Sequence, residues 1–328
     1  MAKWIPAWRY VPIDYNQELG ALENVTQKCV FINNIGGQQL RLRFNNLYSD
    51  EPMRIDRAAI ALHDRQTGVT SPSRSVTLRG STTICIPAGT QPYSDVLDMP
   101  ITPQQDILVS LYFGHRTVLR SVCTTATGFG WQSTQLTGNF GLTDALGYTV
   151  REQLVPPLAH EPYPVQFAAG ICEVSVLAEE DARLIALFGD SITHMSYFMD
   201  SFQAELYARF PGKAAVINGG ISGNRIQKSH PLCPDFPGGG NQFGIAGRDR
   251  FRRDVYDGSR PQAEALRCQY NALIRACSIA DGIVDMDAVL RDPTDIHRMQ
   301  EGLHLGDGVH PNWHGGRRMA DALLAALF

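Results

Sequence analysis

Two residues that can perform nucleophilic chemistry stand far apart in the C-terminal half of the chain. Ser191 follows Gly189-Asp190 after an apolar run, and His310 lies in the segment Asp307-Gly-Val-His310-Pro311. A serine hydroxyl becomes nucleophilic when a neutral imidazole removes its proton, and a carboxylate can orient that imidazole. The pattern predicts Ser191 as nucleophile, His310 as general base and acid, and Asp307 as its partner. The plainer alternative is a helix-capping serine with solvated loop residues.

Predicted elements on either side would position this pair. Residues Leu184 to Phe188 have the length and apolarity of a buried parallel strand, which Gly189 would end in a tight turn. A helix is expected next, so that backbone amides at its N-terminus favour negative charge near Ser191. The apolar face of that helix is predicted to contain Met195, Phe198, Phe202 and Leu206. Asn312 is the expected N-cap of the last helix, whose predicted buried face comprises Met319, Leu323, Leu324 and Leu327.

Three ordered blocks in this region resemble the SGNH (GDSL) hydrolase superfamily. They are Gly189-Asp190-Ser191, Asn218-Gly-Gly-Ile-Ser-Gly223-Asn-Arg225 and Asp307-x-x-His310-Pro311. The resemblance implies a C-terminal α/β flavodoxin-like domain of three layers, with the same roles for the serine, histidine and aspartate. It also implies that the backbone amides of Ser191 and Gly223 form the oxyanion hole. By family analogy alone, the favoured substrate is an acetyl ester of a carbohydrate.

One block of the superfamily is missing from this sequence. A Gly-x-Asn-Asp segment normally supplies an oxyanion-hole asparagine, and none occurs between Gly223 and Asp307. Loss of one such donor typically lowers turnover about a hundred- to a thousandfold. Asn224 is a speculative substitute, although a Gly-Asn pair is more often part of a turn. Asn241 is not assigned this role, because its context resembles a loop before the third strand.

The interval before Pro261 also looks shortened relative to the family. The segment from Val255 leads directly into a predicted helix over Gln262 to Ala280, although a strand-helix-strand unit needs roughly 30 residues. The parallel sheet is therefore expected to be reduced. Its predicted strands are Leu184 to Phe188, Ala214 to Asn218 and Ile283 to Met286.

The N-terminal half has the texture of an all-β sandwich or jelly roll, with short apolar segments between Gly, Pro, Asn and Asp. Predicted strands are Gln39 to Phe44, Ala58 to Leu62, Ser75 to Leu78 and Ile107 to Phe113. Residues 1–178 are expected to form this accessory domain, and residues 179–328 the hydrolase-like domain. The first region also resembles the N-terminal β domain of one branch of the family. Its tryptophans Trp4, Trp8 and Trp131 are interpreted either as sugar-stacking residues or, more ordinarily, as packing.

The composition of the chain limits the classes of molecule that it is expected to bind. The chain has 328 residues, of which 44% are hydrophobic and 19% charged, and a formal net charge of -4. This slight acidity gives no reason to expect nucleic acid, because nucleic-acid binding requires cationic surfaces. The basic cluster of arginines 248, 250, 252 and 253 is interrupted by Asp249 and Asp254, which favours a solvated helix face.

Expectations about localisation, disulfides and metal binding also come from short features of the sequence. No apolar run reaches the length of a membrane span and the first residues lack a secretory core, so a cytoplasmic location is expected for the chain as written. Secretion stays open if a signal has been removed. Seven scattered cysteines predict buried free thiols rather than disulfides or structural zinc. His304, Asp307, His310 and His314 lack the spacing of a zinc-protease site, so neither metal nor cofactor is expected.

The leading hypothesis is therefore a serine ester hydrolase that cleaves small acyl esters, including acetyl groups on carbohydrate, through an acyl-enzyme on Ser191. The alternative is a catalytically impaired SGNH-like protein that acts as a glycan- or protein-binding module. A lipase or thioesterase is a third possibility, which would require a long apolar acyl channel.

Overall fold

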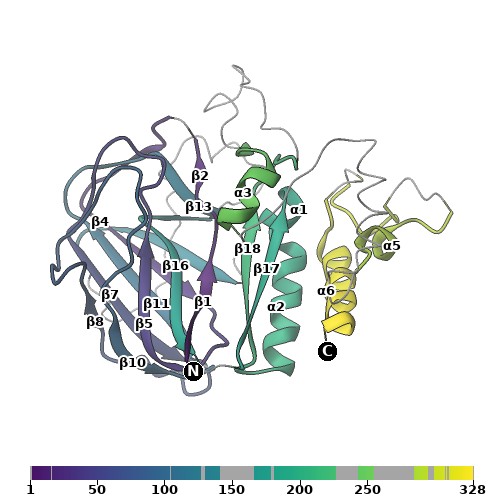
Figure 1. The fold of residues 1–328 in the computed structure, drawn as a ribbon, viewed down its shortest axis with the longest axis horizontal. Coiled ribbons are helices and arrows are strands. Elements are labelled where there is room, and N and C mark those ends of the chain that lie inside the picture. Colours follow the sequence, from purple (N-terminus) through teal and green to yellow (C-terminus); the bar gives the residue numbers. More distant parts are fainter. Residues whose placement is uncertain are drawn as a thin grey trace.

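The computed structural model describes residues 2–15, 17–103, 105–126, 130–140, 166–178, 181–226, 243–254, 284–294, 299–306, 308 and 310–327. Two antiparallel sheets dominate the N-terminal half (Figure 1). The first has the order β1 (Lys3–Arg9), β16 (Ile171–Ala178), β5 (Gly37–Phe44) and β10 (Leu97–Ile101). The second has the order β14 (Trp131–Thr137), β4 (Val25–Phe31), β11 (Gln105–Phe113), β7 (Arg57–Asp64) and β8 (Arg74–Val76).

The alternation of side chains along these strands explains the sandwich. In β5, Leu40, Leu42 and Phe44 are buried, whereas the arginines between them are not. Period-2 burial of this kind places one face of a sheet against the core. All four strands predicted in this half are present. Three small antiparallel sheets complete it: β12 (Thr117–Leu119) with β3 (Gly20–Leu22), β15 (Gln166–Ala169) with β13 (Ser121–Thr125) and β2 (Ile13–Asp14), and β6 (Met53–Ile55) with β9 (Ile84–Ile86).

The predicted flavodoxin-like domain of three layers is wrong. In the described part of the chain, the parallel sheet consists of β17 (Arg183–Gly189) and β18 (Ala214–Gly220). The far edge of β18 is met by the N-terminal region, through a parallel bridge between Tyr10 and Asn218. Figure 1 shows β1 beside β18, with helices on the opposite side. Among the described residues, the edge of β18 away from β17 therefore continues into the N-terminal region and not into a further strand of a doubly wound domain.

The helices in the described part of the chain are α1 (Ser191–His194), α2 (Tyr197–Arg209), α3 (Gly247–Asp254), α5 (Met286–Leu290) and α6 (Trp313–Leu327). The helix predicted after Ser191 is broken in two, because Ser196 adopts the left-handed conformation with φ 69°. Met286 begins a helix, so the strand predicted at 283–286 is wrong at its described end. Asn312 caps α6 as predicted, its Oδ1 accepting from the amides of His314 and Gly315. Leu327 is exposed, contrary to expectation.

Of the two hydrophobic clusters among the described residues, the larger runs through both regions of the chain. It joins sandwich residues such as Ile5 and Val174 to Phe202 and Leu206 of α2 and to Val216 of β18. The prediction of a buried strand at Leu184 to Phe188 holds for pairing but not for burial, since Leu184 is 43% exposed and β17 is half-buried. β18 is buried throughout, because it lies between β17 and β1.

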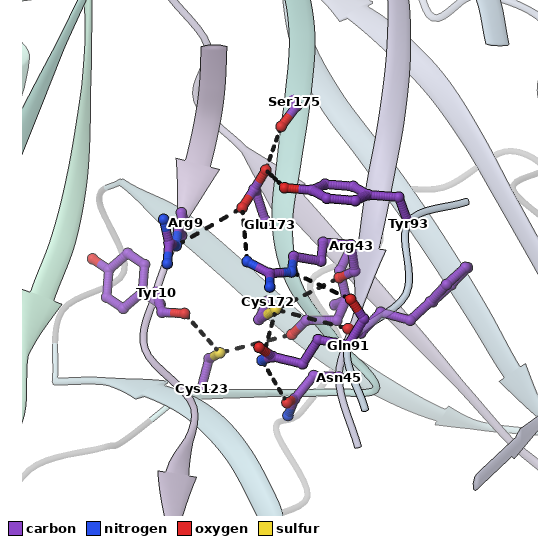
Figure 2. Close-up of polar contacts among 12 residues, drawn as sticks. Arg9, Tyr10, Arg43, Asn45, Gln91, Tyr93, Cys123, Cys172, Glu173 and Ser175 are labelled. Carbon is purple, nitrogen blue, oxygen red and sulfur yellow. Dashed lines mark hydrogen bonds and ion pairs between the residues drawn. The ribbon is translucent and has the colours of Figure 1, made fainter. Parts of the chain in front are cut away.

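A buried carboxylate ties three strands of the first sheet together (Figure 2). Glu173 of β16 lies 3.8 Å from Arg9 Nε and 3.8 Å from Arg43 Nη1, and it accepts from Tyr93 Oη at 3.0 Å and from Ser175 Oγ. Burial of one carboxylate is tolerated when cations and hydroxyls surround it. This cluster therefore has a structural role, next to the expected boundary at residue 178.

The cysteines largely agree with expectation. Cys29, Cys123 and Cys172 are free and buried, and burial raises the pKa of each thiol. Figure 2 shows the sulfurs of Cys123 and Cys172 against backbone carbonyls. Cys85 is an exposed thiol, so the prediction of burial is wrong there. The cysteines at 233, 268 and 277 lie outside the described residues, as does the helix predicted over 262–280.

Candidate active site

The predicted nucleophile sits at the first position of a helical turn. The side chain of Asp190 accepts from the amide of Ile192 at 3.1 Å, so Asp190, and not Ser191, caps α1. The plainer interpretation of Ser191 as the N-cap therefore does not apply. Its hydroxyl is left available for another partner.

That partner is the predicted base. Ser191 Oγ lies 2.8 Å from His310 Nε2, across 119 residues of sequence. The distance is that of a direct hydrogen bond, which is the geometry required for transfer of the serine proton to a neutral imidazole. The structure thus brings together two of the three predicted catalytic residues. Asp307 lies outside the described residues.

The loop that carries His310 is held in place by hydrogen bonds to its backbone groups. The carbonyl of His310 accepts from the amide of Leu305 at 2.9 Å. Asn312 Nδ2 donates to the carbonyls of Gly302 and His304, and its amide donates to Leu303. His304 Nδ1 in turn accepts from the amides of Gly306 and Gly308. His304 therefore shapes the loop, and the described residues contain no group of three potential metal ligands.

Close packing of α6 on α2 brings this loop to Ser191. A Cβ built on Gly316 would lie 2.9 Å from the carbonyl oxygen of Tyr197 and 3.0 Å from Phe198 Cα. Only glycine permits so close an approach of two helices without displacement. Because Gly316 lies six residues after His310 and Tyr197 six residues after Ser191, this contact sets the separation of the two reactive groups.

The turn expected to provide an oxyanion donor lies beside the nucleophile. The amide of Ile221 donates to the carbonyl of Gly189 at 3.1 Å, and that of Asn224 donates to Ile221 at 3.0 Å. Gly223 has φ +73°, which with this closing bond indicates a type II turn over residues 221–224. Within the described chain, neither the amide of Gly223 nor that of Ser191 has an acceptor. Both remain available to an oxyanion.

Asn224, the speculative substitute donor, is already occupied. Its Nδ2 donates to the carbonyls of Phe243 at 2.7 Å and Ile245 at 2.8 Å. Its Oδ1 accepts from Arg250 Nε at 2.9 Å. The side chain therefore fixes the chain around residue 244 and has no amide proton left for a substrate. Asn241 lies outside the described residues.

Arg250 contradicts the prediction of a solvated helix face. Its side chain is fully buried and forms an ion pair with Asp254 at 2.8 Å. Nη1 also donates to the carbonyl of Gly219, Nη2 donates to that of Gly189, and the guanidinium stacks on Phe188 at 4.1 Å. Carbonyl groups at the ends of parallel strands need donors, and Arg250 supplies them. The side chains of arginines 248, 252 and 253 lie outside the description.

Sequence reasoning did not identify His194, which is partly buried at the end of α1, the helical turn that begins with the nucleophile. Nδ1 accepts from the amide of Ser222 at 3.2 Å, and Nε2 lies 3.0 Å from the carbonyl of Thr124 in β13. Burial, aided by the nearby charge of Arg250, lowers the pKa of His194 to about 4. The ring is therefore neutral at ordinary pH. A histidine three residues after a serine carries no recognisable sequence signal.

A buried polar network joins the N-terminal region to the same place. Ser196 Oγ lies 3.0 Å from Tyr10 Oη, and it accepts from Thr125 Oγ1 at 3.3 Å and from Asn218 Nδ2 at 3.0 Å. Asn218 also donates to the carbonyl of Thr193 and accepts from the amide of Gly220. The sandwich is thus hydrogen-bonded directly to the segment that follows Ser191.

The tryptophans do not all share one environment. Trp8 and Trp131 are buried, with ring centroids 5.4 Å apart, and both contact Tyr10 and Phe31. These two are core residues. Trp4 is partly exposed and covers the guanidinium of Arg41 at 4.3 Å. No helix among the described residues is long and apolar enough to cross a bilayer.

Comparison with known proteins gives little further guidance. No protein-family model matches the chain, and no curated protein matches it. One solved structure that resembles it is an active-site mutant of a family two carbohydrate esterase from Clostridium thermocellum in complex with celluohexase. The match covers 98% of this chain and 91% of that one, at 14% identity and a TM-score of 0.28. A similarity this low carries no argument about function.

Proposed function

We propose that the protein is a serine ester hydrolase whose nucleophile is Ser191 and whose base is His310. The observation that carries the proposal is the 2.8 Å contact between Ser191 Oγ and His310 Nε2. The sequence motifs of the two residues predicted this contact. A serine that only capped a helix would not need a histidine so distant in the sequence. Asp307 is proposed to orient the imidazole, on its spacing from His310 alone.

The proposed reaction has two balanced steps. Ser191 Oγ attacks the acyl carbonyl while its proton passes to His310 Nε2, and that proton is then given to the departing alcohol. Water next attacks the acyl-enzyme, losing a proton to His310, which returns it to Ser191 as the acid is released. The free amides of Ser191 and Gly223 are proposed to bind the oxyanion in both steps.

Two amide donors without an asparagine side chain predict a weak or moderate enzyme. Removal of one oxyanion donor costs about a hundred- to a thousandfold in turnover in other serine hydrolases. Acetyl esters of carbohydrates are the proposed physiological substrates. This choice rests on the superfamily resemblance of the three sequence blocks.

The deciding experiment compares the wild type with Ser191→Ala on nitrophenyl acetate, butyrate and octanoate, and on acetylated xylan and cello-oligosaccharides. We expect hydrolysis of short acyl esters that falls to background in Ser191→Ala and in His310→Ala. His314→Ala is the matched control, because His314 is exposed on α6 and should leave the rate unchanged. A phosphonate ester should label Ser191, as mass spectrometry of the peptide would show.

Three outcomes separate the alternatives. Equal background in wild type and Ser191→Ala would reject the hydrolase and favour a glycan- or protein-binding module. A preference for octanoate over acetate would favour a lipase or thioesterase. Release of acetate from the polysaccharides, lost in Ser191→Ala, would support the carbohydrate esterase.

A further inference from the structure

His194 joins three segments that meet at the proposed site. It is the last residue of α1, the helical turn that begins with Ser191. Its ring contacts Ser222 in the turn that carries Gly223, and Thr124 in β13 of the N-terminal region. The ring does not take the place of His310, because it is His310 Nε2 that contacts the serine hydroxyl and both nitrogens of His194 have other partners.

Backbone groups determine the tautomer of His194. The amide of Ser222 can only donate, so Nδ1, at 3.2 Å, carries no proton. The carbonyl of Thr124 can only accept, so Nε2, at 3.0 Å, carries one. Ser222 Oγ, at 2.7 Å from Nδ1, is then a second donor to the same nitrogen. Both ring nitrogens of this partly buried histidine have partners in the neutral Nε2-H form.

We propose that His194 is a positioning residue that holds the 221–224 turn so that the amide of Gly223 faces the oxyanion formed at Ser191. This inference rests on the proposed function. In the turn, the amide of Asn224 is bound to Ile221 and that of Ser222 is bound to His194, which leaves the amide of Gly223 for a substrate. The orientation of that amide depends on the turn type, because the central peptide nearly reverses between types I and II.

Few other contacts restrain the first peptide of the turn, which lies between Ile221 and Ser222. Gly223 is confined by Phe243, since a Cβ at Gly223 would lie 2.2 Å from Phe243 Cδ1. Ile221 is held by Gly189. Ser222, which lies between them, has His194 as its described backbone partner. Loss of the Nδ1 acceptor would free the peptide between Ile221 and Ser222 and would leave a partly buried amide without its acceptor.

Thr124 gives this arrangement a connection to the sandwich. It lies in β13, which pairs with β15 and β2, and its neighbour Thr125 donates to Ser196. The imidazole is therefore braced by a strand of the N-terminal region on one side while it holds the turn on the other. This explains why the N-terminal region is packed against the proposed site.

Two isosteric variants separate the two ends of the ring. Asn places an acceptor near the Nδ1 position, whereas Gln places a donor near the Nε2 position. In His194→Asn the turn keeps its acceptor, and we expect kcat within about threefold of the wild type. In His194→Gln the turn loses it, and we expect kcat to fall about 10- to 100-fold with KM within about threefold, less than complete loss of an oxyanion donor.

A second pair tests the same bond from the turn. Ser222→Pro removes the donating amide, and proline is favoured at the second position of a type II turn, so the fold should persist. We expect kcat to fall as in His194→Gln. Ser222→Ala removes the hydroxyl and keeps the amide, and it should stay near the wild type.

The outcomes distinguish this inference from the proposed function. Failure of the function would show as wild-type activity equal to that of Ser191→Ala. Two results would contradict the inference while the wild type is active. One is an unchanged kcat in His194→Gln and Ser222→Pro. The other is an equal fall in kcat in His194→Asn and His194→Gln that follows the loss of thermal stability in each. The 15N amide signal of Gly223 tests positioning without substrate: it should move further in His194→Gln than in His194→Asn, and equal shifts in the two variants overturn the inference.

Discussion

Arg250 Nη2 donates to the carbonyl oxygen of Gly189 at 2.8 Å, two residues before the proposed nucleophile. Nη1 of the same guanidinium donates at 2.7 Å to the carbonyl of Gly219, on the paired strand. One buried cation therefore fastens the carboxyl ends of β17 and β18, the ends at which Ser191 and the 221–224 turn begin. The sheet edge that carries the chemistry is held by a side chain from α3.

Replacement of Arg250 should destabilise the protein strongly. Arg250→Met removes the charge opposite the buried carboxylate of Asp254 and leaves two strand-end carbonyls without this donor. Breaking a buried ion pair from one side costs about 3–5 kcal/mol. Urea unfolding measures the loss. Arg209→Met is the matched control, because Arg209 forms an exposed i,i+4 pair with Glu205 at 3.3 Å, worth about 1 kcal/mol or less. Equal losses in the two variants would contradict this account.

Gly316→Ala should impair catalysis more than stability. Alanine normally stabilises a helix interior by about 0.5–1 kcal/mol relative to glycine. Here its Cβ would meet the backbone of Tyr197 and Phe198 at 2.9–3.0 Å, so α6 must shift and carry His310 away from Ser191. A misplacement of about 1 Å can cost on the order of a hundredfold in rate. We expect kcat to fall about 10- to 100-fold with a modest change in melting temperature.

The control for this prediction is the opposite change, from alanine to glycine, at another position of α6. Ala325 is exposed near the end of the same helix, so Ala325→Gly should lower stability slightly and leave kcat unchanged. Full activity in Gly316→Ala would show that the α2–α6 contact does not set the distance between Ser191 and His310.

Several features of the fold were predictable because their signals are local. The apolar run before Gly189, the alternation in β5, the continuous apolar run in β11 and the asparagine cap of α6 each follow from a few neighbouring residues. The meeting of Ser191 with His310 was predicted from two short motifs at the ends of such elements. The number of layers could not be predicted, because the segment that pairs with the far edge of β18 contains Tyr10, which lies 208 positions before Asn218 in the sequence.

Arg250 and His194 show why the remainder of the site could not be predicted. Alternating charges around Arg250 are typical of a solvated helix, and its burial depends on two strand-end carbonyls distant in sequence. His194 acts through Thr124, 70 residues away, and through Ser222, 28 residues away. Neither pairing leaves a spacing pattern. Tertiary contact alone decides the role of each residue.

The buried tryptophans should contribute to stability. Trp131 is 1% exposed within the aromatic cluster, and removal of such a side chain to alanine costs about 3–5 kcal/mol. Trp4 is partly exposed and stacks on Arg41, a contact worth about 1 kcal/mol. Urea unfolding should therefore show a much larger loss for Trp131→Ala than for Trp4→Ala. Similar small losses in both would mean that Trp131 is not part of a tightly packed core.

Stability should decline in mild acid because of His194. Its pKa is about 4 in the folded protein, below the value of 6.5 for an unperturbed histidine. Below pH 6.5 the unfolded chain therefore binds a proton that the folded chain refuses until about pH 4, so unfolding becomes easier as the pH falls through this window. The full difference corresponds to about 3 kcal/mol. Above pH 6.5 this contribution to stability is fully present.

Comparison with His194→Asn isolates this effect from the titration of carboxylates, which both proteins share. The charge that faces His194 is that of Arg250, and it is the same in both. At pH 7.5 the wild type should be the more stable in urea. Between pH 6.5 and 4.5 its advantage should shrink by about 2–3 kcal/mol, because asparagine cannot be protonated. Parallel stability curves for the two proteins would show that His194 is protonated as readily when folded as when unfolded, and so is not held as a neutral ring.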